Sequence, residues 1–168
     1  MPKLIIDLNA TKENAINELN DFIDNRLHSY ESLRNYDLGE DNHQNVSLLS
    51  PYIRHRLITE QEVISAALNK FPLPKIEKFI QEVLWRTYWK GWLELRPRVW
   101  DDYKGNILIN NDKKQLLEKV LSYETDIDCF NIWTKELIET NYLHNHARMW
   151  YASTVSYTHL TLPTTGVV

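Results

Sequence analysis

The stretch N-V-S-L-L-S-P-Y places two hydroxyl side chains at a predicted helix start. Ser50 is a favourable N-cap residue, and Pro51 follows at the first helical position, where its missing N–H costs nothing. The unpaired N–H groups and dipole at such a start attract anions such as phosphate. Ser47 and Ser50 therefore indicate either a phosphate site or an ordinary helix start that binds nothing.

The stretch Q-E-V-L-W-R-T-Y-W combines charge with aromatic side chains. Glu82 and Arg86 are four residues apart, so they share a helix face with Trp85 beside them. One interpretation is an exposed ion pair that contributes roughly a few tenths of a kcal/mol. Because the surrounding helix is apolar, we expect instead a partly buried pair, and buried charges are usually retained for reasons other than stability.

The stretch L-H-N-H-A-R-M-W presents a mixed face. Asn145, Arg148 and Met149 recur at helical spacing, so an amide, a guanidinium and a thioether project to one side. This pattern fits a polar ligand, or an Arg that bonds helix-end carbonyls beside an Asn near its own cap. His144 and His146 should point about 200° apart on a helix, so no metal site is predicted there.

A further set of basic residues could line a phosphate-binding face or form an ordinary solvated surface. These residues are Arg54, His55, Arg56, Lys90, Arg96 and Arg98.

The elements that position these residues are all predicted to be helices. The first runs from Thr11 to Tyr30, and T-E-Q-E forms a capping box from Thr59 to Glu62. A long apolar helix from Lys75 past Trp92 should be central to the fold. Further helices are expected at 50–58, 113–124, 129–140 and 142–153, with a loop at 34–45 and an irregular connection at 96–114. The fold class is all-α.

Composition limits the class of protein. A chain of 168 residues with 43% hydrophobic residues can bury the core of one domain. Cys129 is the single cysteine, which excludes a disulfide framework and a Cys-rich zinc site and fits a reducing compartment, so we expect a cytoplasmic protein. No segment is long enough to cross a membrane. The net charge of −4 gives no general attraction to nucleic acid, and the six Trp and nine Tyr fit either a core or a pocket for a flat ligand.

Taken in order from Tyr30 to Ser153, these stretches resemble the helical FAD-binding domain of the DNA photolyase/cryptochrome family. V-S-L-L-S-P-Y is similar to the family's T-S-x-L-S-P-Y loop, with Val46 in place of Thr. F-I-Q-E-V-L-W-R-T-Y-W is similar to W-x-x-E-L-x-W-R-E-F, and L-H-N-H-A-R-M is similar to M-H-N-R-x-R-M. His146 stands where the family has Arg, and Thr87 where it has Glu.

The resemblance implies FAD as cofactor and assigns residues to two sites. The expected FAD-binding residues are Tyr30, Ser47, Leu49, Ser50, Phe79, Arg86, Asn145 and Arg148. Glu82, Trp85 and Met149 would face the cavity that receives a pyrimidine dimer flipped out of UV-damaged DNA. The implied activity is that of a deoxyribodipyrimidine photolyase, in which light drives electron transfer from reduced FAD to the dimer. The alternatives are a flavin-based blue-light sensor without repair activity and a helical interaction module that has lost flavin binding.

The last residues are expected not to belong to this domain. V-S-Y-T-H-L-T-L-P-T resembles a translated sequencing adapter and shows neither capping nor helical period. We therefore expect residues 1–153 to form the N-terminal part of an incomplete FAD domain and residues 154–168 to be read-through, extended or disordered. Such a truncated fragment would bind FAD poorly and be inactive, so the activity is predicted for the parent protein.

Overall fold

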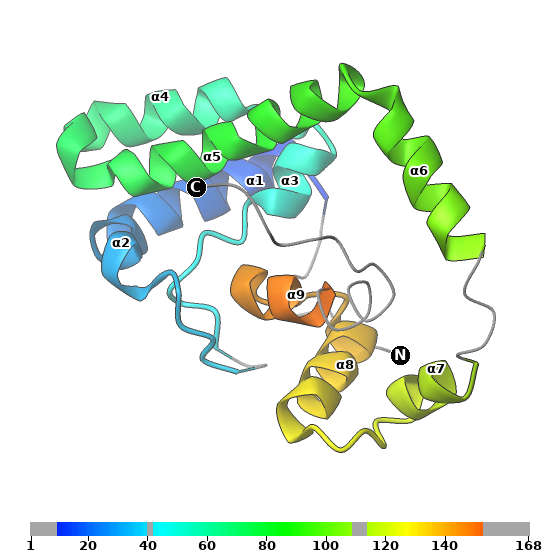
Figure 1. Cartoon of the computed structure of the whole chain (residues 1–168). Helices are drawn as coiled ribbons and strands as arrows, with labels where there is room; N and C mark the ends of the chain where they lie inside the picture. Colours follow the sequence, from blue (N-terminus) through cyan, green and yellow to red (C-terminus); the bar gives the residue numbers. More distant parts are fainter. Residues whose placement is uncertain (1–9, 40–41, 109–113, 153–168) are drawn as a thin grey trace. The chain divides into compact units, whose positions relative to one another are not determined.

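The computed structural model describes residues 10–39, 42–108 and 114–152, and the expected adapter segment lies outside them. The described residues form helices and loops without a strand, so the predicted all-α class is confirmed (Figure 1). Backbone contacts divide the chain into two compact units, with α1 to α5 in the first and α6 to α9 in the second. The α-helices are α1 (Lys12–Asp21), α2 (Tyr30–Leu33), α3 (Ser50–Arg54), α4 (Glu60–Lys70), α5 (Leu73–Glu94), α6 (Pro97–Leu108), α7 (Lys114–Leu121), α8 (Asp128–Thr140) and α9 (Asn145–Ala152).

The first helical segment begins where its capping residue predicts. The Thr11 side chain accepts a hydrogen bond from the Asn14 N–H at 3.2 Å, which satisfies one of the unpaired donors of the first turn. After α1 the chain continues through a π-helical turn, η1 (Phe22–Arg26), and a 3-10 turn, η2 (Leu27–Ser29), into α2. The predicted single helix is therefore one continuous helical path whose winding changes along its length.

The capping box at the start of α4 is confirmed. Thr59 Oγ1 accepts from the Glu62 N–H at 3.2 Å, and Glu62 Oε2 accepts from the Thr59 N–H at 2.7 Å. Lys12 also donates to Glu62 at 2.9 Å. The hydrogen bond from Lys12, followed by those from Thr59, lowers the pKa of Glu62 from 4.5 to about 2, because all of them favour the charged carboxylate.

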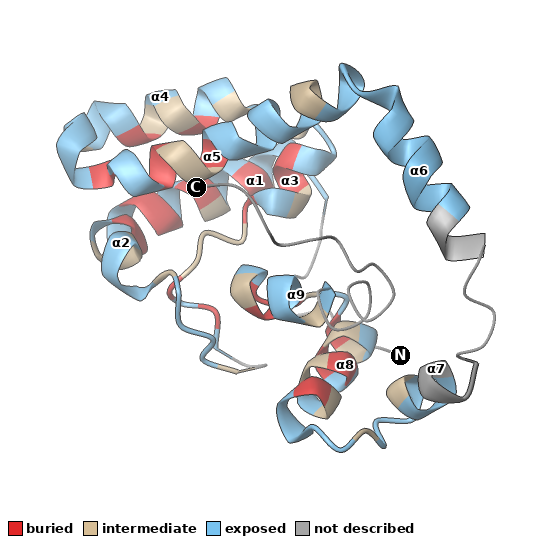
Figure 2. Cartoon of the chain, viewed as in Figure 1, coloured by how far each residue is buried: buried red, intermediate tan, exposed pale blue. Residues whose placement is uncertain are grey.

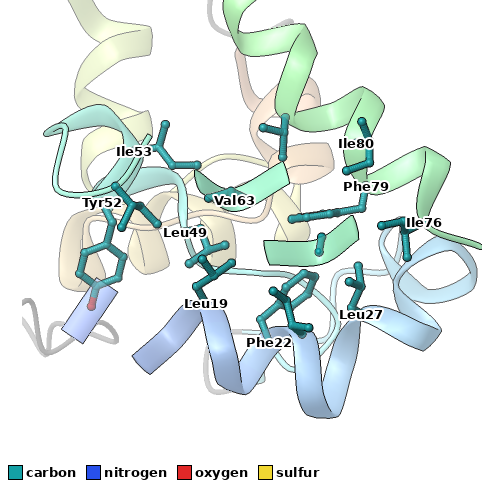
Figure 3. Close-up of a cluster of buried hydrophobic side chains, with 14 of the residues drawn as sticks. Leu19, Phe22, Leu27, Leu49, Tyr52, Ile53, Val63, Ile76, Phe79 and Ile80 are labelled. Atoms are coloured by element: carbon teal, nitrogen blue, oxygen red, sulfur yellow. The ribbon is translucent and has the colours of Figure 1, made fainter. Parts of the chain in front are cut away.

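The core of the first unit is built from the inner faces of several helices. Phe22, Leu27 and Leu49 from the N-terminal half meet Val63 of α4 and Phe79 of α5 (Figure 3). The turn at Phe71 and Pro72 lets α5 fold back beside α4 (Figure 1). These two helices and the α1 to η2 path thus enclose the buried cluster.

Only the first half of α5 is central. Ile76, Phe79, Ile80 and Val83 are buried, whereas the residues from Leu84 onward are exposed apart from a half-buried pair, Gly91 and Trp92 (Figure 2). The prediction of a wholly central helix was wrong for this half. The apolar residues there follow one wide stripe of the helix, which is mostly exposed among the described residues: Leu84, Trp85, Tyr88, Trp89, Trp92 and Leu93.

Residues 97–108 form a helix, α6, where the sequence predicted an irregular connection. Proline at the first helical position costs little, so Pro97 is compatible with this helix start. Local contacts at helical spacing support α6. The Trp100 and Tyr103 rings stack at 5.6 Å, and Lys104 pairs with Asp101 at 3.0 Å.

In the second unit, α8 contacts both α7 and α9. The Phe130 ring of α8 stacks on the Tyr151 ring of α9 with centroids 4.6 Å apart and planes 8° apart. Asn141 ends α8 in the left-handed region, at φ 57°, as a C-terminal Asn commonly does. The helix end predicted near Asn141 is confirmed.

No helix in the parts of the chain described here is long and apolar enough to span a membrane.

Candidate functional site

The segment Val46–Ser50 takes a defined backbone path just before α3. Leu49 is buried in the core and anchors the segment, while Leu48 adopts a left-handed conformation at φ 54°. Ser47 Oγ accepts from the Leu49 N–H at 3.4 Å. Leu49 is the N-cap residue and Ser50 the first residue of α3, so the helix begins one residue earlier than Ser50 capping predicted. The exposed Ser50 hydroxyl is therefore not the helix cap.

Two buried polar side chains hold the start of this segment. Arg26 Nη1 donates to the Val46 carbonyl at 3.1 Å, and Asn45 Nδ2 donates to the carbonyls of Leu33 and Tyr36 at 2.8 and 2.6 Å. Both side chains come from residues that are more than nine-tenths buried. The segment is thereby tied to the η1 turn on one side and to the end of α2 on the other.

Tyr30 and Phe79 are brought together, but within the core. Their ring centroids lie 5.4 Å apart at 83°, and each ring also contacts Phe22. Phe79 is only 3% exposed, whereas Tyr30 is half-buried at the edge of the cluster. Phe79 therefore serves the core in this structure, and its contact with a flavin stays a prediction.

Glu82 and Arg86 each have a partner outside α5. Arg34 donates to Glu82 at 2.6 Å, and Arg86 Nε lies 3.8 Å from Glu60 Oε1 of α4. The expected pair between Glu82 and Arg86 is thus replaced by bridges from α5 to the end of α2 and to α4. Helical spacing shows only which residues share a face, and these neighbouring helices supply closer partners.

The exposed half of α5 carries a row of aromatic side chains that starts at a candidate residue. Trp85 is 48% exposed, stacks on Trp89 with centroids 6.0 Å apart, and meets the Tyr88 ring edge-on at 5.4 Å. Trp92 continues the row at 5.7 Å from Trp89. Trp85 and Arg86, adjacent in sequence, are both exposed.

In the second unit, the three candidates lie on α9. Asn145 is its first residue and is exposed, as are Arg148 and Met149, the latter at 61%. Arg148 Nη2 donates at 3.4 Å to the carbonyl of Leu143, which lies two residues before α9 and not among the last carbonyls of a helix. Arg148 and Met149 are thus adjacent in sequence, and both side chains are exposed.

The two histidines do not diverge as predicted. Their rings stack with centroids 5.6 Å apart, because His144 precedes α9 and is not bound by helical geometry. His144 Nδ1 instead accepts from the His146 N–H at 3.2 Å. Among the described residues, no group of three His, Cys, Asp or Glu side chains is placed to hold a metal ion.

The six basic residues considered above are all exposed, as in the solvated-surface alternative. Arg56 pairs with Glu60 at 2.8 Å. Arg54, His55, Arg56 and Lys90 belong to the first unit, whereas Arg96 and Arg98 belong to the second.

Sequence reasoning missed three residues that hold the candidate groups: Arg26, Arg34 and Glu60. A signal existed for Arg26, which falls on the apolar side of the first helical segment, where an unpaired charge would be costly. Arg34 and Glu60 gave no such signal, because their partners are distant in sequence.

Two comparisons with known proteins find photolyases among the proteins similar to this chain. The chain is 30% identical over 148 residues to a (6-4) photolyase of Agrobacterium fabrum, a match that covers 83% of this chain and 28% of that protein. The chain belongs to the photolyase/cryptochrome family. A bacterial class III photolyase from Agrobacterium tumefaciens has the same fold over 89% of this chain and 32% of its own, with a TM-score of 0.72 and 24% identity. No family model matches the chain.

Family membership is therefore confirmed, as is the all-α fold. The chain spans about a third or less of the length of these photolyases. The family-derived roles of the eleven candidate residues stay predictions. Eight of these residues lie in the first unit, and Asn145, Arg148 and Met149 lie in the second.

Proposed function

We propose that this chain is part of a flavoprotein that binds FAD and acts on UV-damaged DNA. One observation carries the proposal: each unit presents an exposed guanidinium next in sequence to a large exposed apolar side chain. Arg86 follows Trp85 on α5, and Met149 follows Arg148 on α9. A flat ring that carries negative charge needs both kinds of group, an apolar surface to lie against and a cation nearby.

The polar segment before α3 fits the diphosphate part of the same cofactor. Ser47 and Ser50 supply hydroxyl groups, and the left-handed turn at Leu48 fixes the backbone between them. Hydroxyl and backbone N–H donors are the usual neutral ligands of phosphate oxygens. Leu49 would act from the core, as the anchor of this segment. Tyr30 would lie close by through its aromatic contacts, and Phe79 would support Tyr30 from within the core.

The remaining candidates are assigned to the DNA side. Trp85 offers an exposed indole on which an extruded base can stack, and Glu82, held by Arg34, offers a carboxylate that accepts hydrogen bonds from base N–H groups. Met149 would add an adaptable apolar contact. When bound, FAD supplies light-driven electron transfer to a pyrimidine dimer, while the side chains supply binding and orientation.

The flavin assignment is tested on the full-length protein that contains this segment. We expect the purified protein to be yellow, and Arg86→Ala and Arg148→Ala to lose flavin, because each removes a cation that the proposal assigns to flavin binding. Flavin absorbance after gel filtration measures retention. Lys75→Ala, at an exposed lysine on the same helix as Arg86, is the matched control.

Two outcomes would contradict parts of the proposal. A colourless wild-type protein would favour a helical interaction module, and flavin retention by both Arg variants would refute the site assignment. Blue light should also remove dimers from UV-damaged DNA. A yellow protein that leaves the dimers intact would instead be a flavin-based light sensor.

A further inference from the structure

Arg26 is a cation within the first unit whose charge is already balanced by protein groups. Its side chain is 9% exposed, and Nη2 donates to Glu18 Oε1 at 2.5 Å and to Asp21 Oδ2 at 2.8 Å. Its guanidinium also lies over the Phe22 ring, 5.4 Å from the centroid. A buried cation with two carboxylate partners is unsuited to bind a phosphate directly, because the negative charges beside it would repel the ligand.

The other end of the same guanidinium reaches the chain next to the candidate phosphate segment. Nη1 donates to the Val46 carbonyl at 3.1 Å, one residue before Ser47. Asn45 adds a second point of attachment through its two hydrogen bonds to the Leu33 and Tyr36 carbonyls. The backbone from Asn45 to Val46 is therefore fixed on both sides by buried side chains.

The path after Val46 depends on this attachment. Ser47 accepts from the Leu49 N–H, Leu48 is held at positive φ, and Leu49 enters the core (Figure 3). A left-handed Leu costs roughly 1–2 kcal/mol and persists only where the surroundings hold it. Leu49 fixes the far end of the segment, and Arg26 with Asn45 fixes the near end.

We propose that Arg26, assisted by Asn45, is a positioning residue that holds Ser47 to Ser50 in the conformation that binds the phosphates of the cofactor. The inference rests on the proposed FAD binding and deepens it. Arg26 acts through the backbone of Val46 and touches no ligand itself. Its loss should weaken phosphate recognition specifically, because a binding segment that must be ordered on ligand association binds less tightly.

The test compares the two halves of the cofactor in the full-length protein. Arg26→Met keeps most of the side-chain volume but removes every donor, and Arg26→Lys keeps the charge. We expect Arg26→Met to weaken binding of FAD and of ADP on the order of tenfold, while riboflavin, which lacks phosphate, binds nearly as to wild type. Arg26→Lys should restore part of the loss. Calorimetry well below the midpoint of thermal unfolding gives the dissociation constants.

The controls separate positioning from a general loss of structure. Lys70→Met removes an ion pair with Asp24 elsewhere in the same unit and should leave all three affinities unchanged. If Arg26→Met does not fold, Asn45→Ala provides the second variant, with the same expected selectivity for phosphate.

Each result has a distinct meaning. The inference would be overturned if Arg26→Met bound FAD as tightly as wild type does. The same holds for Asn45→Ala if the Arg26 variant does not fold. It would also be overturned if the affinities for FAD and riboflavin fell in parallel. If wild type and Lys70→Met bind none of the three ligands, the proposed flavin site itself fails.

Discussion

At the scale of single residues, burial divides the large side chains into two groups. Phe22 and Phe79 pack against each other with ring centroids 5.0 Å apart and are almost fully buried. Trp85 and Trp150 expose about half or more of their surface, at 48% and 68%. The excess of aromatic residues, which fitted either a core or a ligand pocket, therefore serves the core at some positions and lies on the surface at others.

Phe79 tests this division directly. Phe79→Ala should lower the free energy of unfolding by about 3–5 kcal/mol, because it leaves a cavity beside Phe22 and Tyr30. Trp85→Ala should change it by less than about 1 kcal/mol, since the indole is half exposed. Urea unfolding followed by circular dichroism measures both. If Phe79→Ala retained wild-type stability and lost only flavin, Phe79 would be a cofactor ligand and not a core residue.

The lowered pKa of Glu62 predicts that the stability of the folded chain depends on pH. Its pKa is lowered from 4.5 to about 2 in the folded chain, so the stabilisation is fully present above pH 4.5 and is lost as the pH falls towards 2. Glu62→Gln removes the charge but keeps an acceptor for the capping box. The urea midpoint should therefore fall less between pH 5 and pH 2.5 in Glu62→Gln than in wild type.

Thr59→Ala provides a second check on this prediction. This substitution removes a hydroxyl that donates to Glu62 at 2.9 Å and accepts from the Glu62 N–H. The urea midpoint of Thr59→Ala should therefore also fall less between pH 5 and pH 2.5 than that of wild type. Identical acid profiles in wild type and both variants would mean that Glu62 does not contribute to the acid sensitivity.

At the scale of elements, the N-terminal helices could be predicted better than the later ones. The start of α1 at Thr11 and of α4 at Thr59 followed from capping side chains, which act within three residues. Helix α6 was not predicted, although Trp100 and Tyr103 stand three residues apart, at helical spacing, and stack in the folded chain. The contacts of the candidate site could not be predicted from the sequence either. Arg34 and Glu82 are 48 residues apart, so only the folded chain reveals that they form a pair.

Three glycines allow a test at this scale. Gly91 in α5 and Gly105 in α6 have helical backbones, and an added Cβ would meet no atom within 4 Å. Gly91→Ala and Gly105→Ala should each raise the free energy of unfolding by about 0.5–1 kcal/mol. Gly39→Ala should lower it, since Gly39 has φ +89°. Thermal unfolding measures all three.

The result for Gly91 also reports on its surroundings. If Gly91→Ala lowered stability in the full-length protein while Gly105→Ala raised it, another part of that protein would have to pack closely against α5 at Gly91.

At the scale of the whole molecule, both units expose large apolar side chains. Trp85, Tyr88 and Trp89 of the aromatic row on α5 are exposed, as are Met149 and Trp150 of α9. Exposed apolar groups of this size usually mark a surface that binds a ligand or another part of a protein. The chain also spans only 28% of the matched (6-4) photolyase. The exposed apolar side chains fit the proposal that these faces meet a flavin or DNA.

The exposed half of α5 also has a consequence for spectroscopy. None of the six tryptophans belongs to the buried core, and four of them, Trp85, Trp89, Trp100 and Trp150, are at least 48% exposed. Their indoles are already in contact with water, so their emission should lie far to the red and shift little when the core melts. A shift to the blue, or quenching by an acceptor, would instead signal that something has covered the surface. Intrinsic tryptophan fluorescence is thus a reporter of binding in this protein, whereas the Phe and Tyr residues of the core are silent in it.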